Sequence, residues 1–373
     1  MKDLPVTVRR SIELLGLLGI GYIFAKASEV ITPFLMAFFL AIMLLPIYRF
    51  LKRIRFPEVL AIALSLLTAL VLLVFVGWFF WMQIARLLAD IPTIQENLNA
   101  HFRSISGWIN EKTNFTTQQQ LEWLRAQSNS MLGNATNYLS GAALTVTGVF
   151  VFIGLLPIYA FLILYYKNLL IKFVFTWFSP GKYDTVNKTL LQVETIIKSY
   201  LVGLLIQITY ITVLLGGLLM ILGIKHALLI GLVFAFLNLI PYVGALIGNI
   251  IGVLLTITSS QDLTPVITVL ASIAVVQFLD NNILMPRIVG SKVRLNALAS
   301  IIGVIIGGAL AGVAGMFLSL PVMAILKITF DHSDSFKHWG LILGDEQPKA
   351  NPMTRLWIGR RKRTSPPRQT DKE

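Results

Sequence analysis

The 373-residue sequence contains no cysteine, only four histidines, and a charged fraction of 13%. The absence of cysteine excludes structural disulfides and thiolate-bound metal sites, although it does not identify a compartment. The low charge, beside a hydrophobic fraction of 56%, lies far outside the range of soluble proteins. The composition therefore excludes an ordinary soluble globular domain.

Signatures of catalysis are also missing from the sequence. It has no His-Glu-x-x-His motif and no phosphate-binding Gly-x-x-x-x-Gly-Lys-Ser/Thr loop. An aspartyl membrane protease requires a pair of carboxylates, and no second acid accompanies Asp280 in its apolar run. We therefore expect no enzymatic activity, no ATP-driven pumping, no cofactor and no bound metal.

The net charge of +13 is distributed in a way that argues against nucleic-acid binding. Much of it lies in short loops and in the segment 349–372, which contains Arg360-Arg361-Lys362-Arg363. Basic loops and tails next to membrane spans face the cytoplasm and attract anionic lipid head groups. The expected partner of these residues is therefore the lipid surface.

Apolar runs of about 17 to 25 residues recur along the chain and match helices that cross a hydrocarbon core roughly 30 Å thick. The fold class is therefore an all-α polytopic membrane protein. The first run is expected to stay uncleaved, because a second begins almost at once, at Val30. We predict about six full spans, near 11–27, 30–48, 59–82, 143–166, 201–223 and 264–285.

Two further apolar regions, 226–258 and 298–330, are too long for one crossing. As a straight helix each would extend about 50 Å, well beyond the hydrocarbon core. Proline and glycine also disfavour a continuous helix. These interruptions are Pro241 and Gly244 in the first region, and Gly307, Gly308 and Gly312 in the second.

Basic residues discriminate between two topologies for these regions. The loop 49–58 is strongly basic, so it and the N-terminus are expected in the cytoplasm. If both long regions were single spans, giving eight plain spans, the basic loop after 285 would face outside. If each is a re-entrant hairpin, that loop and the basic C-terminus face inside. We predict two re-entrant helical hairpins, which form an inverted repeat with their neighbouring spans.

The chain divides into five predicted parts. Segment 83–142 is too polar to span, and the apolar stripe Val186, Leu190, Val193 and Ile197 suggests a helix lying in the membrane interface. The parts are N-terminal scaffold spans (1–82), an extracytoplasmic helical insert (83–142), a fourth span with a cytoplasmic interfacial helix (143–200), a transport unit (201–330) and a basic cytoplasmic tail (331–373).

Asp280 is the main candidate for a functional site. An ionisable side chain at membrane depth is costly, so it is a functional-site hypothesis by default. We expect Asp280 to bind a proton, an ion or a polar solute, with polar contributions from Gln277, Asn281, Asn282 and Asn238. The structural alternative is that these groups satisfy free backbone groups of a hairpin.

Other features also allow both a functional and a structural interpretation. Asp280 lies only a turn or two from the basic loop, so an ion pair with Arg287 is a second structural alternative. Pro241 and Gly244 form either a gating hairpin tip or a simple kink. Gln207 is interpreted as a contact between helices, because a lone amide in an apolar run more often has that role than binds a ligand.

Several motifs together resemble one known family. They are 236–244 (Phe-Leu-Asn-Leu-Ile-Pro-Tyr-Val-Gly), 277–281 (Gln-Phe-Leu-Asp-Asn), 284–290 (Leu-Met-Pro-Arg-Ile-Val-Gly) and a glycine-rich run ending at Pro321. This combination closely resembles the autoinducer-2 exporter family of bacterial permeases. Ala245 is a departure, since many relatives have proline there.

The resemblance implies a pentameric protein of the bacterial cytoplasmic membrane that moves its hairpin half against a scaffold half, in the manner of an elevator. It associates some members with autoinducer-2 export and others with sodium/proton antiport. The family motif carries over to Asn238, Pro241, Gly244, Gln277, Asp280, Asn281, Pro286, Gly290 and Pro321.

The leading hypothesis is a secondary transporter that exports a small hydrophilic solute. Sodium or potassium exchange for protons is the alternative within transport. A third hypothesis is a membrane scaffold without transport that docks partners through 83–142 and the tail.

Overall fold

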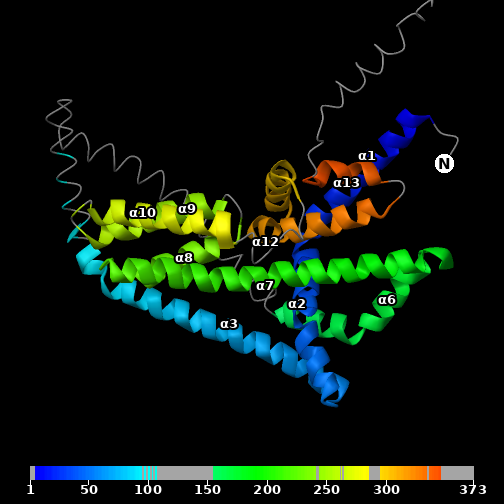
Figure 1. Cartoon of the computed structure of the whole chain (residues 1–373), viewed down its shortest axis with the longest axis horizontal. Helices are drawn as coiled ribbons and strands as arrows, with labels where there is room; N and C mark the ends of the chain where they lie inside the picture. Colours follow the sequence, from blue (N-terminus) through cyan, green and yellow to red (C-terminus); the bar gives the residue numbers. More distant parts are fainter. Residues whose placement is uncertain are drawn as a thin grey trace, which may run out of the picture.

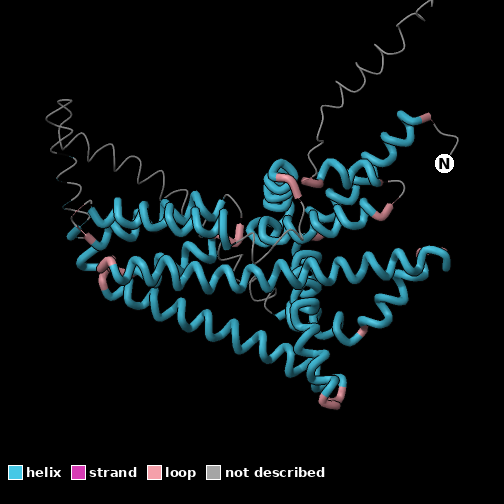
Figure 2. The backbone as a smooth tube through the Cα atoms, viewed as in Figure 1, coloured by secondary structure: helices cyan, strands magenta, loops and turns pink. Residues whose placement is uncertain are grey.

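The computed structural model describes residues 5–94, 96, 97, 100, 103, 106, 154–240, 243–260, 262, 264–284, 295–333 and 336–345. These residues form helices joined by short turns, with no β-strand among them (Figure 2). The helices are α1 (Val6–Lys26), α2 (Ser28–Arg53), α3 (Glu58–Ala89), an unlabelled helix Gly154–Tyr165, α6 (Lys167–Thr176), α7 (Tyr183–Ile221), α8 (Ala227–Leu237), α9 (Val243–Ser259), α10 (Thr264–Leu279), α12 (Ala297–Asp331) and α13 (Lys337–Leu343). Two short turns complete them, a 3-10 turn η1 (Pro180–Lys182) and a π-helical turn η2 (Asp280–Leu284).

The chain is a polytopic helical membrane protein, as predicted. Within the described residues, five helices are long and apolar enough to cross a membrane, or six if the bent pair Gly154–Tyr165 and Lys167–Thr176 counts as one span. These five spans are α2, α3, α7 together with η1, α10 together with η2, and α12. The first predicted span corresponds to α1, which is not among them, because its sequence includes Arg9, Arg10 and Glu13.

The helix α7 is the element against which the others are arranged. It is 39 residues long and runs the length of the molecule, with α8, α9 and α10 along its C-terminal half and α2 crossing it near the middle (Figure 1). The predicted boundary at residue 200 lies inside this helix. The stripe expected in the membrane interface instead belongs to α7, where Val186 and Ile197 are buried.

The first long apolar region is a helical hairpin made of α8 and α9. Glycines on α9 pack against α8 at positions progressively farther from the turn, which places the two helices antiparallel. A Cβ on Gly244 would collide with the Leu237 carbonyl oxygen, and one on Gly248 would lie 2.6 Å from the Phe234 ring. The turn at the hairpin tip is therefore closed tightly on its own backbone.

The second long apolar region, α12, also folds back on itself. Ala311 and Gly312 leave the helical conformation, and Gly312 has a φ of 57°, a left-handed value that glycine adopts at little cost. The two arms meet so closely that a Cβ on Gly315 would collide with the Gly307 carbonyl oxygen. Beside this contact Gly308 faces Met316. Both interruptions predicted from proline and glycine are therefore real turns of the chain.

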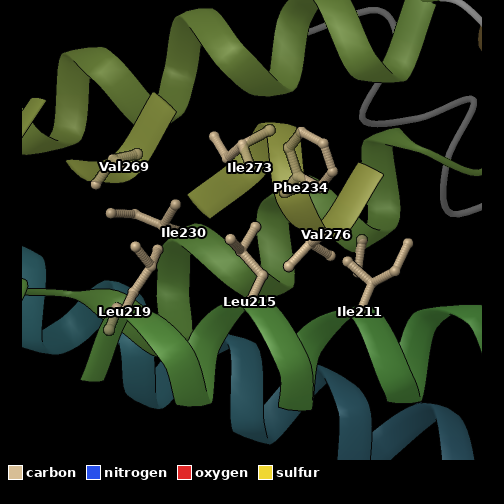
Figure 3. Packing of buried hydrophobic residues seen from close by; sticks show 10 residues of the cluster. Ile211, Leu215, Leu219, Ile230, Phe234, Val269, Ile273 and Val276 are labelled. Carbon is tan, nitrogen blue, oxygen red and sulfur yellow. The ribbon is translucent and has the colours of Figure 1, made fainter. Parts of the chain in front are cut away.

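Packing between α7, α8 and α10 forms the largest buried cluster. Ile211, Leu215 and Leu219 of α7 face Ile230 and Phe234 of α8, and Val269, Ile273 and Val276 of α10 close the cluster (Figure 3). At Gly231 the helices α7 and α8 approach closely, since a Cβ there would lie 2.7 Å from the Gly216 backbone nitrogen. Small residues allow the close van der Waals packing that associates helices in lipid. The three helices therefore form one packed body.

The open end of the first hairpin is tied to the chain that follows α3. Asp90 Oδ2 lies 3.2 Å from His226 Nε2 and 3.8 Å from Lys225 Nζ. Burial lowers the pKa of His226, and the negative charge of Asp90 partly opposes this shift. Asn97 donates a hydrogen bond of 3.0 Å to the Thr258 carbonyl oxygen near the end of α9. Both ends of the hairpin therefore contact the segment after α3.

The contact between Gly307 and Gly315 predicts that Gly315→Ala destabilises the protein. The added methyl group has to displace backbone and not a flexible side chain, and such overpacking costs about 1–3 kcal/mol. Thermal unfolding in detergent measures the loss. Gly217→Ala is the matched control, since a Cβ there meets nothing within 4 Å. Equal stability of the two variants would contradict the close contact.

Candidate functional site

Asp280 occupies the end of α10, where the helix widens into the π-helical turn η2. Its side chain is buried, with 2% of the residue exposed. Turns of π-helix inside α-helices are rare and occur frequently at functional sites. The acid predicted as the centre of the site is thus enclosed by protein, and its hydrogen-bond partners decide its properties.

Three side chains donate hydrogen bonds to the Asp280 carboxylate. Gln207 Nε2 and Asn238 Nδ2 both donate to Oδ2, at 3.0 and 3.1 Å. The Tyr210 hydroxyl donates to Oδ1. Hydrogen bonds to a charged acceptor are roughly twice as strong as neutral ones. The arrangement therefore stabilises a negative charge on a side chain that the protein buries.

Local structure explains why these donors converge. Gln207 and Tyr210 are three residues apart on α7 and so share one helix face. Asn238 is the C-cap residue of α8, and the tight tip of the first hairpin holds it beside α10. The carboxylate therefore connects three separate elements: α7, the hairpin tip and η2.

The chemical groups of the cluster are all polar. It offers one carboxylate, two amides and one hydroxyl, a set suited to protons and to hydrogen-bonding solutes. The Gln207 Oε1 atom is buried without a hydrogen-bond partner among the described residues. Within that same part of the chain, no group of three or more His, Cys, Asp or Glu side chains is placed to hold a metal ion.

Comparison with known proteins identifies the family. The family model described as AI-2E family transporter matches residues 12–334. The chain belongs to this family. It is 24% identical over 354 residues to the AI-2 transport protein TqsA of Escherichia coli (strain K12), covering 92% of this chain and 97% of that protein. It is also 24% identical over 313 residues to YrrI of Bacillus subtilis (strain 168), covering 82% and 87% of the two chains.

Membership of the AI-2E transporter family, together with the apolar helices, establishes a multi-pass membrane protein of a transporter family. The family match covers α1 to α12, so it includes Asp280, its three donors and both hairpins. The site residues of this chain are inferred from its own geometry and not from the family match.

The structure separates the predicted site residues into two groups. Asn238, predicted as a polar ligand, donates a hydrogen bond to Asp280. Gln277 donates instead to Asn281 at 3.2 Å, and Asn282 donates to the Phe278 carbonyl oxygen of its own helix. Asn281 and Asn282 are exposed. Within the described part of the chain these three amides are bonded elsewhere than to the carboxylate, and two of them pair with each other along one face of the turn.

The predicted hairpin residues are also distributed unevenly. Gly244, Gly307, Gly308 and Gly312 lie at or beside the two turns. Pro321 is buried within the second arm of α12. Pro241, Pro286 and Gly290 lie outside the described residues, as does Arg287.

Sequence reasoning missed two residues of the cluster. Gln207 had been assigned to a contact between helices, which is correct, but its partner is Asp280. Tyr210 had not been singled out at all. The available signal was their shared face on α7, three residues apart, within an otherwise apolar stretch. The 70 residues that separate Tyr210 from Asp280 hide this signal from any local pattern.

A thermodynamic cycle tests the cluster in this transporter. Asn238→Leu removes one donor to a buried carboxylate, and we expect a loss of about 1–3 kcal/mol in unfolding free energy. Combined with Asp280→Leu, the losses are expected to be non-additive, as for residues in direct contact. Unfolding in mixed detergent micelles measures both. Gln277→Leu is the control, and a coupling to Asp280 as large as that of Asn238 would contradict the observed pairing.

Proposed function

We propose that this transporter is a secondary transporter that exports a small hydrophilic solute, and that Asp280 is its proton-sensitive polar contact. The observation that carries the proposal is the buried Asp280 carboxylate, which links the tip of a helical hairpin to a second helix. A buried charge of this kind is costly to maintain and is typical of substrate and proton pathways. A purely structural helix contact is made at lower cost by apolar or small residues.

The proposed mechanism moves the transport unit, residues 201–330 with α8, α9, α10 and α12, relative to a scaffold containing α2 and α3, in the manner of an elevator. The division into a moving body and a scaffold is supported by their separate buried clusters. One buried cluster joins α7, α8 and α10, and another joins α2, α3 and the helix Gly154–Tyr165. A third cluster, with Phe39 of α2 against Leu204 of α7 and Leu318 of α12, forms the contact between the two bodies.

The solute is proposed by analogy. TqsA carries the description AI-2 transport protein, and it aligns along nearly the full length of this chain. We therefore take autoinducer-2, or a similarly small polyhydroxylated signalling molecule, as the first candidate. We also propose a homo-oligomer in the bacterial inner membrane with both termini in the cytoplasm, and contact of the basic tail with anionic lipids.

Replacing Asp280 by asparagine tests the function directly. Asp280→Asn keeps the size of the side chain and removes its charge, so proton-dependent flux of autoinducer-2 in proteoliposomes is expected to fall at least tenfold, equivalent to about 1.4 kcal/mol. Thr209→Val is the control, because that exposed hydroxyl of α7 bonds to the Leu205 carbonyl oxygen of its own helix. Flux equal to the parent would remove Asp280 from the mechanism. Dissipation of a pH gradient by sodium or potassium alone would indicate cation exchange instead.

Cysteine labelling tests the re-entrant topology. The sequence has no native cysteine, so a single Ser291→Cys variant reports one position without background. If both hairpins enter the membrane and return to the same side, this loop lies on the cytoplasmic side and reacts with an impermeant maleimide only there. Reaction only from the outside would establish eight plain spans.

A further inference from the structure

The two oxygens of the Asp280 carboxylate have different partners, and this difference determines where a proton can bind. Oδ2 accepts from Gln207 Nε2 and Asn238 Nδ2, at 3.0 and 3.1 Å. Amide nitrogens donate hydrogen bonds and do not accept them. A proton on Oδ2 would point at two donors, and at least one of these buried bonds would be lost.

Among the described residues, the partner of Oδ1 is the Tyr210 hydroxyl alone. A hydroxyl both donates and accepts, so it can rotate its hydrogen away and accept from a protonated Oδ1. The amide donors meanwhile keep Oδ2 as a carbonyl acceptor. All three hydrogen bonds to the side chain therefore persist in the neutral state. The two amide bonds keep Oδ2 as a weaker, uncharged acceptor, and in the third bond Oδ1 donates to the Tyr210 hydroxyl.

No other titratable group among the described residues of the surrounding helices faces the carboxylate. The sequences of α8, α9 and α10 contain none. On α7 the nearest charged residue is Lys198, nine positions before Gln207 and thus about 14 Å away along the helix axis. Residues 241, 242 and 285–294, which include Tyr242 and Arg287, lie outside the described part. Of the residues that the structure describes, Tyr210 is thus the one titratable partner in contact.

We propose that Asp280 takes up a proton at Oδ1 and that Tyr210 is the positioning residue that makes this possible by reversing its hydrogen bond. The proton comes from the aqueous side that the site faces, and Tyr210 neither gains nor loses one. Gln207 and Asn238 hold Oδ2 in both states. The hairpin tip thus stays attached to α7 and α10 whether Asp280 is charged or neutral, and the packed body carries the proton as a unit.

This inference rests on the proposed transport function only for its role in coupling, so its test uses no solute. Infrared difference spectra of the full-length protein in lipid are recorded between about pH 4 and pH 10. We expect a carboxylic acid carbonyl band that Asp280→Asn abolishes. In Tyr210→Phe, the protonated acid lacks an acceptor, and the band is expected to shift to the higher frequency of a free acid.

Tyr200→Phe is the matched control, since Tyr200 is a second buried tyrosine of α7 that packs in the cluster with Phe39. Its band is expected to match the parent. A band in Tyr210→Phe at the parent position would overturn the assignment of Oδ1, and so would the absence of any band dependent on Asp280.

Gln207→Glu provides a second measurement in case Tyr210→Phe does not fold. It would place a second carboxylate about 3 Å from the first, and two such groups share one proton because both cannot ionise together. The acid band is then expected to persist at least one pH unit higher than in the parent. If the pH midpoint of the acid band were unchanged in this variant, residue 207 would not lie beside Asp280. Normal spectra without autoinducer-2 flux would instead reject the proposed function and leave the proton site intact.

Discussion

A carboxylate enclosed by apolar helices can keep its charge only if the protein itself supplies hydrogen-bond donors. Asp280 obtains these donors from two sides, Gln207 and Tyr210 on α7 and Asn238 at the tip of the first hairpin. Because the cost of an uncompensated buried charge is several kcal/mol, the positions of these elements are coupled to one another through one side chain. The remaining architecture can be understood as the means of holding those donors in place.

Glycine provides the close backbone contacts that make such placement possible. The tip of the first hairpin closes at Gly244, and the second hairpin closes where Gly307 meets Gly315. In both turns the neighbouring backbone occupies the space that a side chain would need. Each hairpin is therefore closely packed beside its turn, and the proposed movement is expected between packed bodies, where contacts such as Phe39 against Leu204 involve ordinary side chains.

The sequence predicted the helical membrane class, both broken regions and the acid at the centre of the site, because each depends on local composition. Prediction from the sequence failed for side chains whose partners are determined by packing between distant parts of the chain. Gln277 and Asn281 have the spacing of neighbours on a helix and do pair with each other, away from the carboxylate. The stripe containing Val186 is part of α7, where Val186 and Ile197 are buried, and its place in the membrane interface stays a prediction. Tyr210 gave no local signal, since its meaning depends on a residue 70 positions later.

The packing of the hairpins and the chemistry of the cluster both bear on the proposed transport cycle. If the first hairpin moved as a whole away from α10, Asn238 would lose its acceptor, and Asp280 would lose one of three donors while keeping Gln207 and Tyr210. Leaving such groups unpaired costs more than their bond contributes. A solute rich in hydroxyl groups could remove this penalty by bonding to both, whereas an apolar molecule could not. The same hydrogen bonds that stabilise the cluster therefore support the proposal of a hydrophilic solute.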